Sequence, residues 1–339
     1  MLALAPMQDV TDLPFMRVVQ RYGGPDIYVT EYFRVHAAYQ LEKHILRSIT
    51  ENKTGRPIFA QMIGHDISAL VRCAKDLLNY PVAGIDLNLG CPAPVVCRKD
   101  AGGGLLRKTD HLNDILGSLR DAIPGKFTVK TRLGYHHEDE FFALLDIFKK
   151  HGIDTLTIHG RTVLERYRTP IHPDCIRHAV EQMHCPVFAN GNVVDAETGL
   201  NLSQQTGAAG IMIGRGAIRN PWIFRQLRAA FSGDKPEVLT RSDLLGYILD
   251  LYQELATYQQ HSGQGAFDER KHVNRMKKYM VYIAQGLDSD FEYQIRRSST
   301  ENEFQRICED FLDTKDPLPV LPPENSKLFC GFSSLRNNA

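Results

Sequence analysis

The stretch GIDLNLGCPAPVVCRKDAGGGLL, residues 84–106, contains an apolar run, an abrupt stop and a glycine-rich segment. The apolar run, residues 84–89, also carries Asp86 and Asn88, which is typical of a buried parallel strand with polar atoms near its end. Pro92 has no N–H group and cannot continue the hydrogen-bond ladder of a sheet, so a loop must begin there. The stretch therefore predicts a strand that delivers polar side chains to a loop at its carboxyl end.

Cys91 stands where this predicted strand ends, and residues 102–104 are three consecutive glycines at which backbone could approach a ligand closely. In an α/β barrel, catalytic groups lie at the carboxyl ends of the strands. Cys91 is therefore a candidate catalytic thiol, although a free cysteine is often only a small buried hydrophobe. The strand by itself does not separate these two interpretations.

The same kind of short β-rich run recurs along the first two thirds of the chain, with amphipathic stretches such as 69–78, 111–122 and 140–150 between the runs. The eight runs are residues 2–5, 27–30, 57–60, 84–89, 127–129, 155–158, 186–189 and 210–213. Alternating β and α units predict a parallel sheet. Eight such units match an α/β (β/α)8 TIM barrel better than an open doubly wound sheet.

The pattern changes after the barrel, and we expect three parts in all: a barrel at residues 1–235, a small all-helical domain at 236–313 and a tail at 314–339. Three helices are predicted in the second part, at 239–258, 271–285 and 301–312. The tail is rich in proline and offers little to pack, so we expect it to be extended or disordered.

Whole-chain composition excludes several classes of protein. The 339 residues carry a formal net charge of zero, so a nucleic-acid partner would have to bind a local basic patch. Seven cysteines without a CxxC pair predict reduced thiols in the cytoplasm, not a disulfide framework or a zinc site. The polar run 136–140 lacks metal-ligand spacing, and no apolar run approaches the roughly 20 residues of a membrane span.

Polar residues follow almost every predicted strand, and their number suggests one shared pocket at the carboxyl end of the barrel. These residues are Gln8, Glu31, Gln61, Asn88, Cys91, Lys130, His159, Asn190 and Arg215. Any one of them could be a structural hydrogen-bonding group. Their coincidence at strand ends is what points to a site.

The last two strands end in Asn190-Gly191-Asn192 and Gly214-Arg215-Gly216. Late barrel strands often bind phosphate through backbone N–H groups and a basic side chain, and the alternative is that both segments are only tight turns.

Lys130 and His159 have two interpretations each. Lys130 lies mid-barrel, with Arg132 on the same side of the strand, and a cation at that depth needs an anionic partner. A reduced flavin would supply that anion, and a Schiff-base aldolase lysine is the rival interpretation. His159 could donate to a phosphate or a substrate carbonyl, or be structural.

Several motifs occur in an order and spacing that resemble the tRNA-dihydrouridine synthase family. They are Ala5-Pro6-Met7, the segment 86–92 (DLNLGCP) with Val96, the segment 130–134 (KTRLG), the segment 159–162 (HGRT), Asn190-Gly191 and Gly214-Arg215-Gly216. The resemblance runs from residue 3 to about 312. It implies an FMN-dependent enzyme with a barrel and a helical domain. Thr30-Glu31-Tyr32 and the segment 272–277 resemble the bacterial C-type branch, which modifies position 16 of the tRNA D-loop.

The resemblance also implies roles for individual residues. It implies an FMN site formed by Pro6, Met7, Gln8, Gln61, Lys130, His159, Asn190, Gly191, Asn192, Gly214 and Arg215. It implies substrate and RNA contacts by Asn88, Glu31 and Arg34. The basic side chains Lys271, Arg275 and Lys278, which share one face of a predicted helix, would bind tRNA phosphates.

The chemistry implied is reduction of the 5,6 double bond of uridine. Flavin N5 would give a hydride to C6 and Cys91 would give a proton to C5, with Cys97 as a nearby competitor. NADPH, or NADH, would re-reduce the flavin. The chain has no GxGxxG motif, so the nicotinamide would use the same open face. We expect a monomer.

The chain departs from the family pattern before Tyr167. Glu165 and Arg166 stand where the family usually has Gln and Gly, which leaves the exact target base open. Three alternatives remain at this point. They are a dihydroorotate dehydrogenase-type flavin barrel, a lysine aldolase that uses Lys130, and an inactive RNA-binding or chaperone-like relative.

Overall fold

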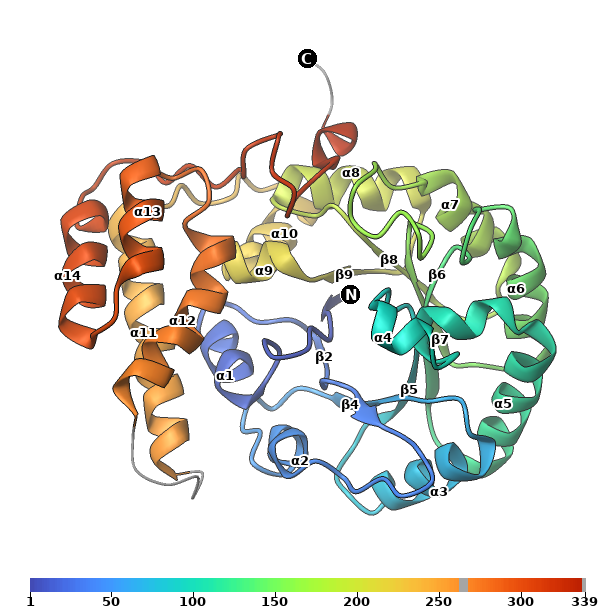
Figure 1. The fold of residues 1–339 in the computed structure, drawn as a ribbon. Coiled ribbons are helices and arrows are strands. Elements are labelled where there is room, and N and C mark those ends of the chain that lie inside the picture. The colour runs from blue at the N-terminus through green and yellow to red at the C-terminus, as the bar shows by residue number, and fades with distance from the viewer. Residues whose placement is uncertain (262–267, 337–339) are drawn as a thin grey trace.

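The structure is a computed structural model that describes residues 1–261 and 268–336, and of His261 only the backbone. Within these residues, nine strands form a single parallel sheet in the order β2-β1-β9-β8-β7-β6-β5-β4-β3, and a further pairing of β2 with β4 closes it into a barrel (Figure 1). The strands are β1 (Leu2–Leu4), β2 (Ile27–Val29), β3 (Phe33–Arg34), β4 (Ile58–Ile63), β5 (Gly84–Leu89), β6 (Phe127–Arg132), β7 (Thr155–His159), β8 (Val187–Asn190) and β9 (Gly210–Ile213).

β1 pairs with both β2 and β9, so the first strand of the chain lies beside the last. Leu4 is the partner of Tyr28 on one side and of Ile213 on the other. The eight predicted strands are all present, and the (β/α)8 prediction is confirmed. The ninth strand, β3, was not predicted because it is only two residues long; it pairs with the far end of β4 through Phe33 and Met62.

Helices cover the outside of the barrel between successive strands. They are α1 (Leu13–Arg21), α2 (Lys43–Thr50), α3 (Ile67–Leu77), α4 (Pro94–Cys97), α5 (Thr109–Ala122), α6 (Glu140–Lys150), α7 (Pro173–Gln182), α8 (Ala196–Thr206), α9 (Arg215–Arg219) and α10 (Ile223–Phe231), with a 3₁₀ helix, η1 (Gly102–Arg107), after α4. Helices α3, α5 and α6 confirm the three predicted amphipathic stretches. Asp66 caps α3 by accepting the N–H of Ala69, which explains where that helix begins.

Two apolar layers hold the barrel together. The larger one lies between the strands and the surrounding helices, and it continues into the C-terminal helices. The smaller one is a cluster inside the barrel that includes Ala3, Val29, Phe59, Phe188 and Met212. Because apolar side chains fill part of the inside of the barrel, the space for a ligand lies toward its carboxyl end.

Four helices follow the barrel: α11 (Arg241–His261), α12 (Glu269–Ile283), α13 (Ser289–Arg297) and α14 (Glu301–Leu312). Three were predicted. The fourth, α13, was not, because its mean hydropathy is low. Asp288 marks its start by accepting the N–H groups of Asp290 and Phe291. Figure 1 shows these helices side by side next to α1, and Arg17 of α1 pairs with Glu254 of α11 at 3.1 Å.

The proline-rich tail is not the loosely packed segment that we expected. It runs back over the barrel toward α8 and ends in a 3₁₀ helix, η2 (Phe332–Leu335) (Figure 1). Phe329, Phe332 and Leu335 are each 3% exposed or less. The proline content drew attention away from these apolar side chains: Phe329 and Phe332 pack with Val194, and Leu335 joins the main core. None of the described helices has the length and apolar character needed to cross a membrane.

Candidate active site

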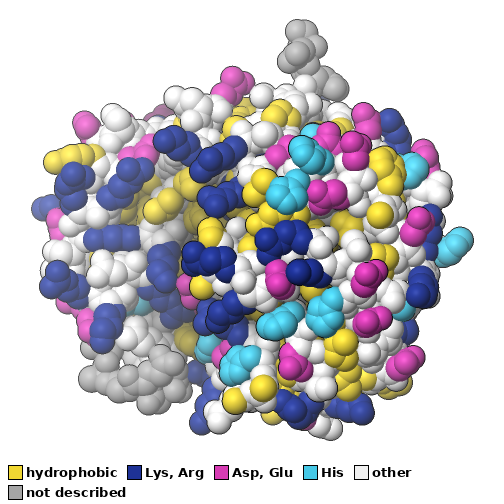
Figure 2. All heavy atoms as spheres, turned by 45° about the vertical axis from the view of Figure 1, so that its right-hand side comes forward, with side chains coloured by type: hydrophobic (Ala, Val, Ile, Leu, Met, Phe, Trp, Pro, Cys, Tyr) yellow, Lys and Arg dark blue, Asp and Glu magenta, His cyan; other side chains and the backbone are white. Residues whose placement is uncertain are grey.

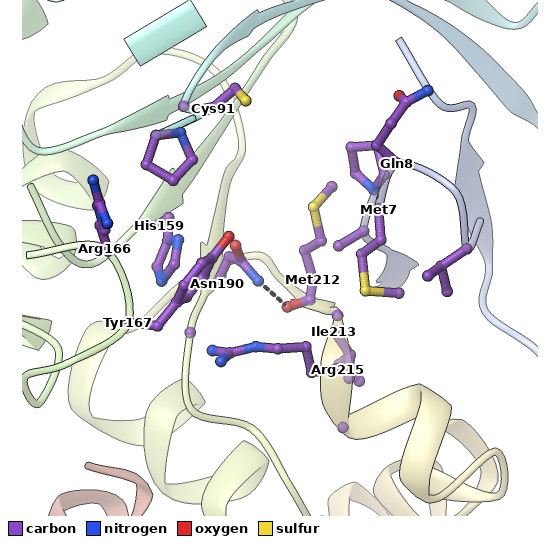
Figure 3. A pocket seen from close by; sticks show the side chains of 18 of the residues that line it. Met7, Gln8, Cys91, His159, Arg166, Tyr167, Asn190, Met212, Ile213 and Arg215 are labelled. Carbon is purple, nitrogen blue, oxygen red and sulfur yellow. Dashed lines mark hydrogen bonds between the residues drawn. The ribbon is translucent and has the colours of Figure 1, made fainter. Parts of the chain in front are cut away.

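A cavity of about 570 Å³ lies at the carboxyl end of the barrel strands. That volume is in the range of small-molecule sites. Of the residues predicted to act in catalysis or binding, twelve line it: Pro6, Met7, Gln8, Asn88, Cys91, Lys130, His159, Asn190, Gly191, Asn192, Gly214 and Arg215. Figure 3 shows Cys91 across the cavity from Arg215, with Met7 and Gln8 on one side and His159 on the other.

The thiol of Cys91 is positioned by backbone contacts of its loop. Asn88 Oδ1 accepts the N–H groups of Gly90 and Cys91, both at 3.0 Å, and the carbonyl of Cys91 accepts the N–H of Gly103 at 3.1 Å. A Cβ atom at Gly103 would lie 2.9 Å from that carbonyl. The glycines therefore allow η1 to pack against the cysteine itself, whereas we had expected them to approach a ligand.

Two neighbours of Cys91 differ in their access to the cavity. Tyr32 lines the cavity, and burial, followed by its interaction with Cys91, raises its pKa to about 12. In the sequence, Tyr32 stood in a recognised motif but had no predicted role. Cys97 is buried, its pKa is raised by burial, and its Sγ donates to the carbonyl of Cys91 at 3.5 Å. Cys97 does not line the cavity, so Cys91 is the thiol that faces it.

A hydrogen-bonded network lies beneath Asn88. Gln61 Nε2 donates to Asp86 (2.7 Å), Asn88 Nδ2 donates to Gln61 Oε1 (2.7 Å), and Thr128 Oγ1 donates to Asp86 (2.6 Å). Burial raises the pKa of Asp86 to about 6. Gln61 was predicted to bind the cofactor, but it does not line the cavity and both ends of its amide are engaged. Gln61 thus lies behind Asn88, to which it is hydrogen-bonded.

Lys130 presents a half-buried cation to the cavity. Its Nζ donates to Asn190 Oδ1 at 3.2 Å. Asn190 Nδ2 in turn donates to the carbonyl of Met212 at 2.8 Å, the bond drawn in Figure 3. Burial and the neighbouring Arg132 lower the pKa of Lys130 to about 8. No ion pair with Lys130 exists among the described residues, so an anionic ligand would stabilise its charged form.

His159 is a neutral hydrogen-bonding group in this site. Burial, then the charges of Arg132 and Lys130, hold its pKa well below the ordinary value. Arg161 Nη1 lies 3.2 Å from His159 Nε2. Because an arginine can only donate, we assign Nε2 as the acceptor and place the ring proton on Nδ1.

Arg215 lies at the opposite end of the cavity from Cys91. Its guanidinium lies 4.2 Å from the ring centre of Tyr167 and 5.9 Å from that of Phe329, and Nη1 donates to the carbonyl of Leu328. The side chain of Asn192 already has two hydrogen-bond partners: it accepts from Arg161 (2.6 Å) and donates to the carbonyl of Gly331. The Arg215 end of the cavity is thus the cationic end.

Backbone at this cationic end is exposed to a ligand. Gly191 has φ +128°, a conformation that suits glycine. A Cβ atom at Gly214 would meet only the side chains of Met7 and Ala5, at 3.5 and 3.6 Å. On the other side, Gln8 Oε1 is buried and has no hydrogen-bond partner among the described residues. A ligand with a polar planar portion and an anionic group therefore fits the cavity.

Three residues predicted to contact RNA from α12 do not form a free basic stripe. Arg275 forms an ion pair with Asp12 of the barrel, Lys271 pairs with Asp268 at 3.3 Å, and Lys278 is exposed. The helix geometry was predicted correctly, but the sequence could not show that an acidic residue 263 positions away meets this face. Of the three, Lys271 and Lys278 reach the surface.

Glu31 and Arg34 do not line the cavity either. Glu31 is buried, and its Oε1 accepts the N–H of Val10 at 3.2 Å. Burial raises the pKa of Glu31 to about 8. Since Val10 itself lines the cavity, Glu31 acts on the site by holding that segment in place.

The surface around the site carries many basic side chains. Figure 2 shows dark blue Lys and Arg side chains gathered around a hollow in which hydrophobic side chains are visible. Among residues 1–261 and 268–336, no group of three or more His, Cys, Asp and Glu is arranged to hold a metal ion.

Comparison with solved structures supports the fold. A morphinone reductase mutant in complex with tetrahydroNAD matches with a TM-score of 0.51 and 9% identity, covering 68% of this chain and 86% of that one. A 2-naphthoyl-CoA reductase complex matches with a TM-score of 0.53 and 11% identity, covering 69% and 50%. At such identities the likeness concerns the barrel.

Comparison of sequences is more specific. The family model "Dihydrouridine synthase (Dus)" matches residues 3–315. The tRNA-dihydrouridine(16) synthase of Cupriavidus necator is 30% identical over 321 residues, covering 91% of this chain and 96% of that protein. The tRNA-dihydrouridine synthase B of Pasteurella multocida is 32% identical over 256 residues, covering 74% and 77%. The chain therefore belongs to the dihydrouridine synthase family.

Proposed function

We propose that this enzyme reduces the 5,6 double bond of a uridine in the tRNA D-loop to give dihydrouridine, with FMN as cofactor and NADPH, or NADH, as reductant. The observation that carries the proposal is one cavity lined by the thiol of Cys91, the cation of Lys130 and, across from Cys91, the guanidinium of Arg215. Family membership supports the same reaction. We place the activity in the cytoplasm, where the substrate is found.

The residues of the cavity fit FMN at both ends. Lys130 would offer its charge to the N1 and C2 oxygen edge of the ring, which becomes anionic on reduction. Gln8 offers an amide without a partner to the polar edge of the ring system. Arg215 and the backbone of Gly191 and Gly214 would bind the phosphate, with a bidentate contact available to the guanidinium.

The chain's own chemistry is proton transfer. When bound and reduced, FMN supplies a hydride to C6 of the uracil ring. Charge then develops on C5 and the C4 oxygen, and the thiol of Cys91 donates its proton to C5 as a general acid. Asn88 fixes the backbone of Cys91 through two hydrogen bonds, so the thiol keeps its place during the transfer.

Tyr32 supports this role of Cys91. Its hydroxyl interacts with the thiol, and a pKa of about 12 keeps the tyrosine protonated at neutral pH. A neutral hydroxyl is a suitable neighbour for a thiolate that forms when the proton is given to C5, because it can donate a hydrogen bond to the sulfur. The proton lost by Cys91 is then regained from solvent at the open mouth of the cavity.

The target uridine must leave the RNA stack to reach the cavity, which costs a few kcal/mol and least in a loop. Basic side chains around the hollow in Figure 2 would hold the surrounding phosphates. Position 16 is the proposed target, because relatives at about 30% identity carry that number in their names.

Two measurements test the proposal. The purified protein should be yellow and carry about one FMN per chain, and Lys130→Ala should release part of it. Incubation with NADPH and tRNA from a strain that lacks dihydrouridine should then introduce the modified base at one D-loop position. A protein that takes up no FMN, or that leaves every uridine unchanged when flavin is bound, contradicts the proposal.

A further inference from the structure

The match to the dihydrouridine synthase family ends at residue 315, yet the chain continues into the cavity beyond that point. Lys327, Leu328 and Phe329 all line it. They lie at the cationic end, where Arg215 donates to the carbonyl of Leu328. A segment outside the family match thus forms part of the wall of the candidate active site.

Strong interactions fasten this segment to the rest of the structure on both sides of the cavity. Before it, the side chain of Arg219, 3% exposed, donates to six backbone carbonyls. The six belong to Tyr282, Ile283, Gln285, Pro319, Val320 and Leu321. Beyond the cavity, Arg336 pairs with Asp195 and Glu197, both at 2.5 Å. The segment is therefore fixed at two anchors with the cavity between them.

Contacts between the anchors act on the cationic end itself. Phe329 is 3% exposed and packs with Val194 and Phe332. Its ring and that of Tyr167 both lie against the guanidinium of Arg215. The carbonyls of Cys330 and Gly331 accept from Arg161 and Asn192, which ties the tail to the loops that carry the other candidate phosphate contacts.

These contacts leave Arg215 with donors to spare. A guanidinium has five N–H donors, and within residues 1–261 and 268–336 Arg215 makes one hydrogen bond, to the carbonyl of Leu328. Two aromatic rings and one carbonyl restrict its rotation without using up its charge. The remaining N–H groups can therefore meet a phosphate with little further loss of side-chain entropy.

We propose that residues 326–331 are a cofactor-binding element of this chain, which orients Arg215 toward the phosphate of FMN and brings Lys327 to the same end of the cavity. The inference rests on the proposed function, because it takes FMN as the ligand. Leu328 and Phe329 are positioning residues that act through Arg215. Lys327 is exposed, and it adds a second charge at the mouth of the cavity.

The test compares FMN with riboflavin, which has the same ring system but no phosphate. Dissociation constants of both flavins are measured for the full chain, for a chain that ends at Asn325, and for Phe329→Leu and Lys327→Ala. A chain that ends at Asn325 still contains the tail carbonyls to which Arg219 donates. Lys315→Ala is the matched control, since Lys315 is an exposed lysine of the same tail that does not line the cavity.

We expect the shortened chain to bind FMN at least about tenfold more weakly, because a hydrogen bond to a charged group contributes on that order. Riboflavin binding should change much less, so that the preference for FMN shrinks. Phe329→Leu and Lys327→Ala should each lower FMN affinity by a smaller factor, and Lys315→Ala should leave both constants unchanged. Thermal unfolding of each flavin-free variant shows whether it is folded. If the shortened chain does not fold, the flavin affinities of Phe329→Leu and Lys327→Ala decide whether the inference holds.

Three results overturn the inference while leaving the proposed function intact. The first is equal FMN affinity of the full chain and of the chain that ends at Asn325, and the second is equal weakening of FMN and riboflavin. Loss of tRNA binding by a flavin-saturated Lys327→Ala variant with unchanged FMN affinity also overturns it, since the lysine would then bind RNA phosphate. A full chain that binds neither flavin would overturn the proposed function itself, and this inference with it.

Discussion

Arg275 of α12 forms an ion pair with Asp12, whose other carboxylate oxygen accepts the N–H of Phe15 at 3.1 Å at the start of α1. One carboxylate thus joins the helical domain to the first helix of the barrel. Burial raises the pKa of Asp12, and the charge of Arg275 opposes that effect. The hydroxyl of Tyr279 donates to the carbonyl of Val10 nearby, at 3.3 Å, which adds a second connection.

Arg275→Ala should destabilise the protein by about 1–3 kcal/mol, because it leaves the buried carboxylate of Asp12 without its cation. The measurement is urea or thermal unfolding of flavin-free protein. Lys278→Ala is the control on the same helix, and its exposed side chain predicts a change within about 0.5 kcal/mol. Equal stability of both variants would mean that the ion pair contributes nothing.

Cys91→Ala should keep its FMN and still be reduced by NADPH, but form dihydrouridine about 10²–10⁴-fold more slowly, because a positioned general acid is lost. Stopped-flow kinetics separate flavin reduction from reaction with tRNA. Cys97→Ala should react with tRNA at nearly the normal rate, because Cys97 does not line the cavity. A normal rate for Cys91→Ala together with a slow rate for Cys97→Ala would mean that Cys97 is the general acid.

Affinity for FMN should decrease as the pH rises above about 8. The free protein has its Lys130 pKa near 8, below the ordinary 10.5, so above that pH an increasing share of Lys130 is neutral. Binding of an anion then requires uptake of a proton, and the dissociation constant should increase by up to about tenfold per pH unit. Lys130→Met should bind more weakly at pH 7 and lack this pH dependence. A parallel decline in both proteins would assign the effect to another group.

Glu31 should make the protein less stable as the pH rises. Its pKa in the folded state is about 8 against 4.5 for the unfolded chain, so between these values the folded state binds more protons. The free energy of unfolding therefore decreases with rising pH in that window. Glu31→Gln keeps an oxygen for the N–H of Val10 and should flatten the dependence, with its largest advantage above pH 8. Unfolding curves from pH 5 to 9 check this, and identical slopes would contradict it.

Lys271→Ala/Lys278→Ala should weaken tRNA binding and reduce the slope of log K against log salt by about 2, because each lysine that no longer neutralises a phosphate lowers the slope by about 1. Flavin content and NADPH oxidation should stay normal, because both belong to the barrel. Filter binding across a salt series gives the slope. Unchanged affinity and slope would show that α12 does not meet the RNA.

Local patterns predicted the barrel well. Each of the eight strands is a short apolar run, and its place in the sheet follows from the regular alternation with helices. Cys91 and Lys130 could be assigned to the cavity for the same reason, since a side chain at a strand end or facing inward has few other places to go. Within a strand, the two-residue period correctly put Lys130 and Arg132 on one side.

Pairings over long sequence separations could not be predicted. Gln61 follows a predicted strand like the other polar residues, but its amide is hydrogen-bonded to Asp86 and Asn88, and no local pattern shows that. Arg275 carries the same charge as Lys278, yet it meets Asp12 from the other end of the chain. The packing of the tail could not be predicted either, because a proline-rich composition says nothing about the surface on which the tail's apolar residues pack.

The docking of the tail also fixes when the active site is complete during synthesis on the ribosome. β1 needs β9 as a neighbour, so the barrel cannot close before residue 213 has emerged. The wall formed by Leu328 and Phe329 emerges more than a hundred residues later still. Domains generally fold as the chain appears, from the N-terminal side. In this chain, the barrel would form first as a shell with an open phosphate end, and tight capture of the cofactor would be one of the last steps of its maturation.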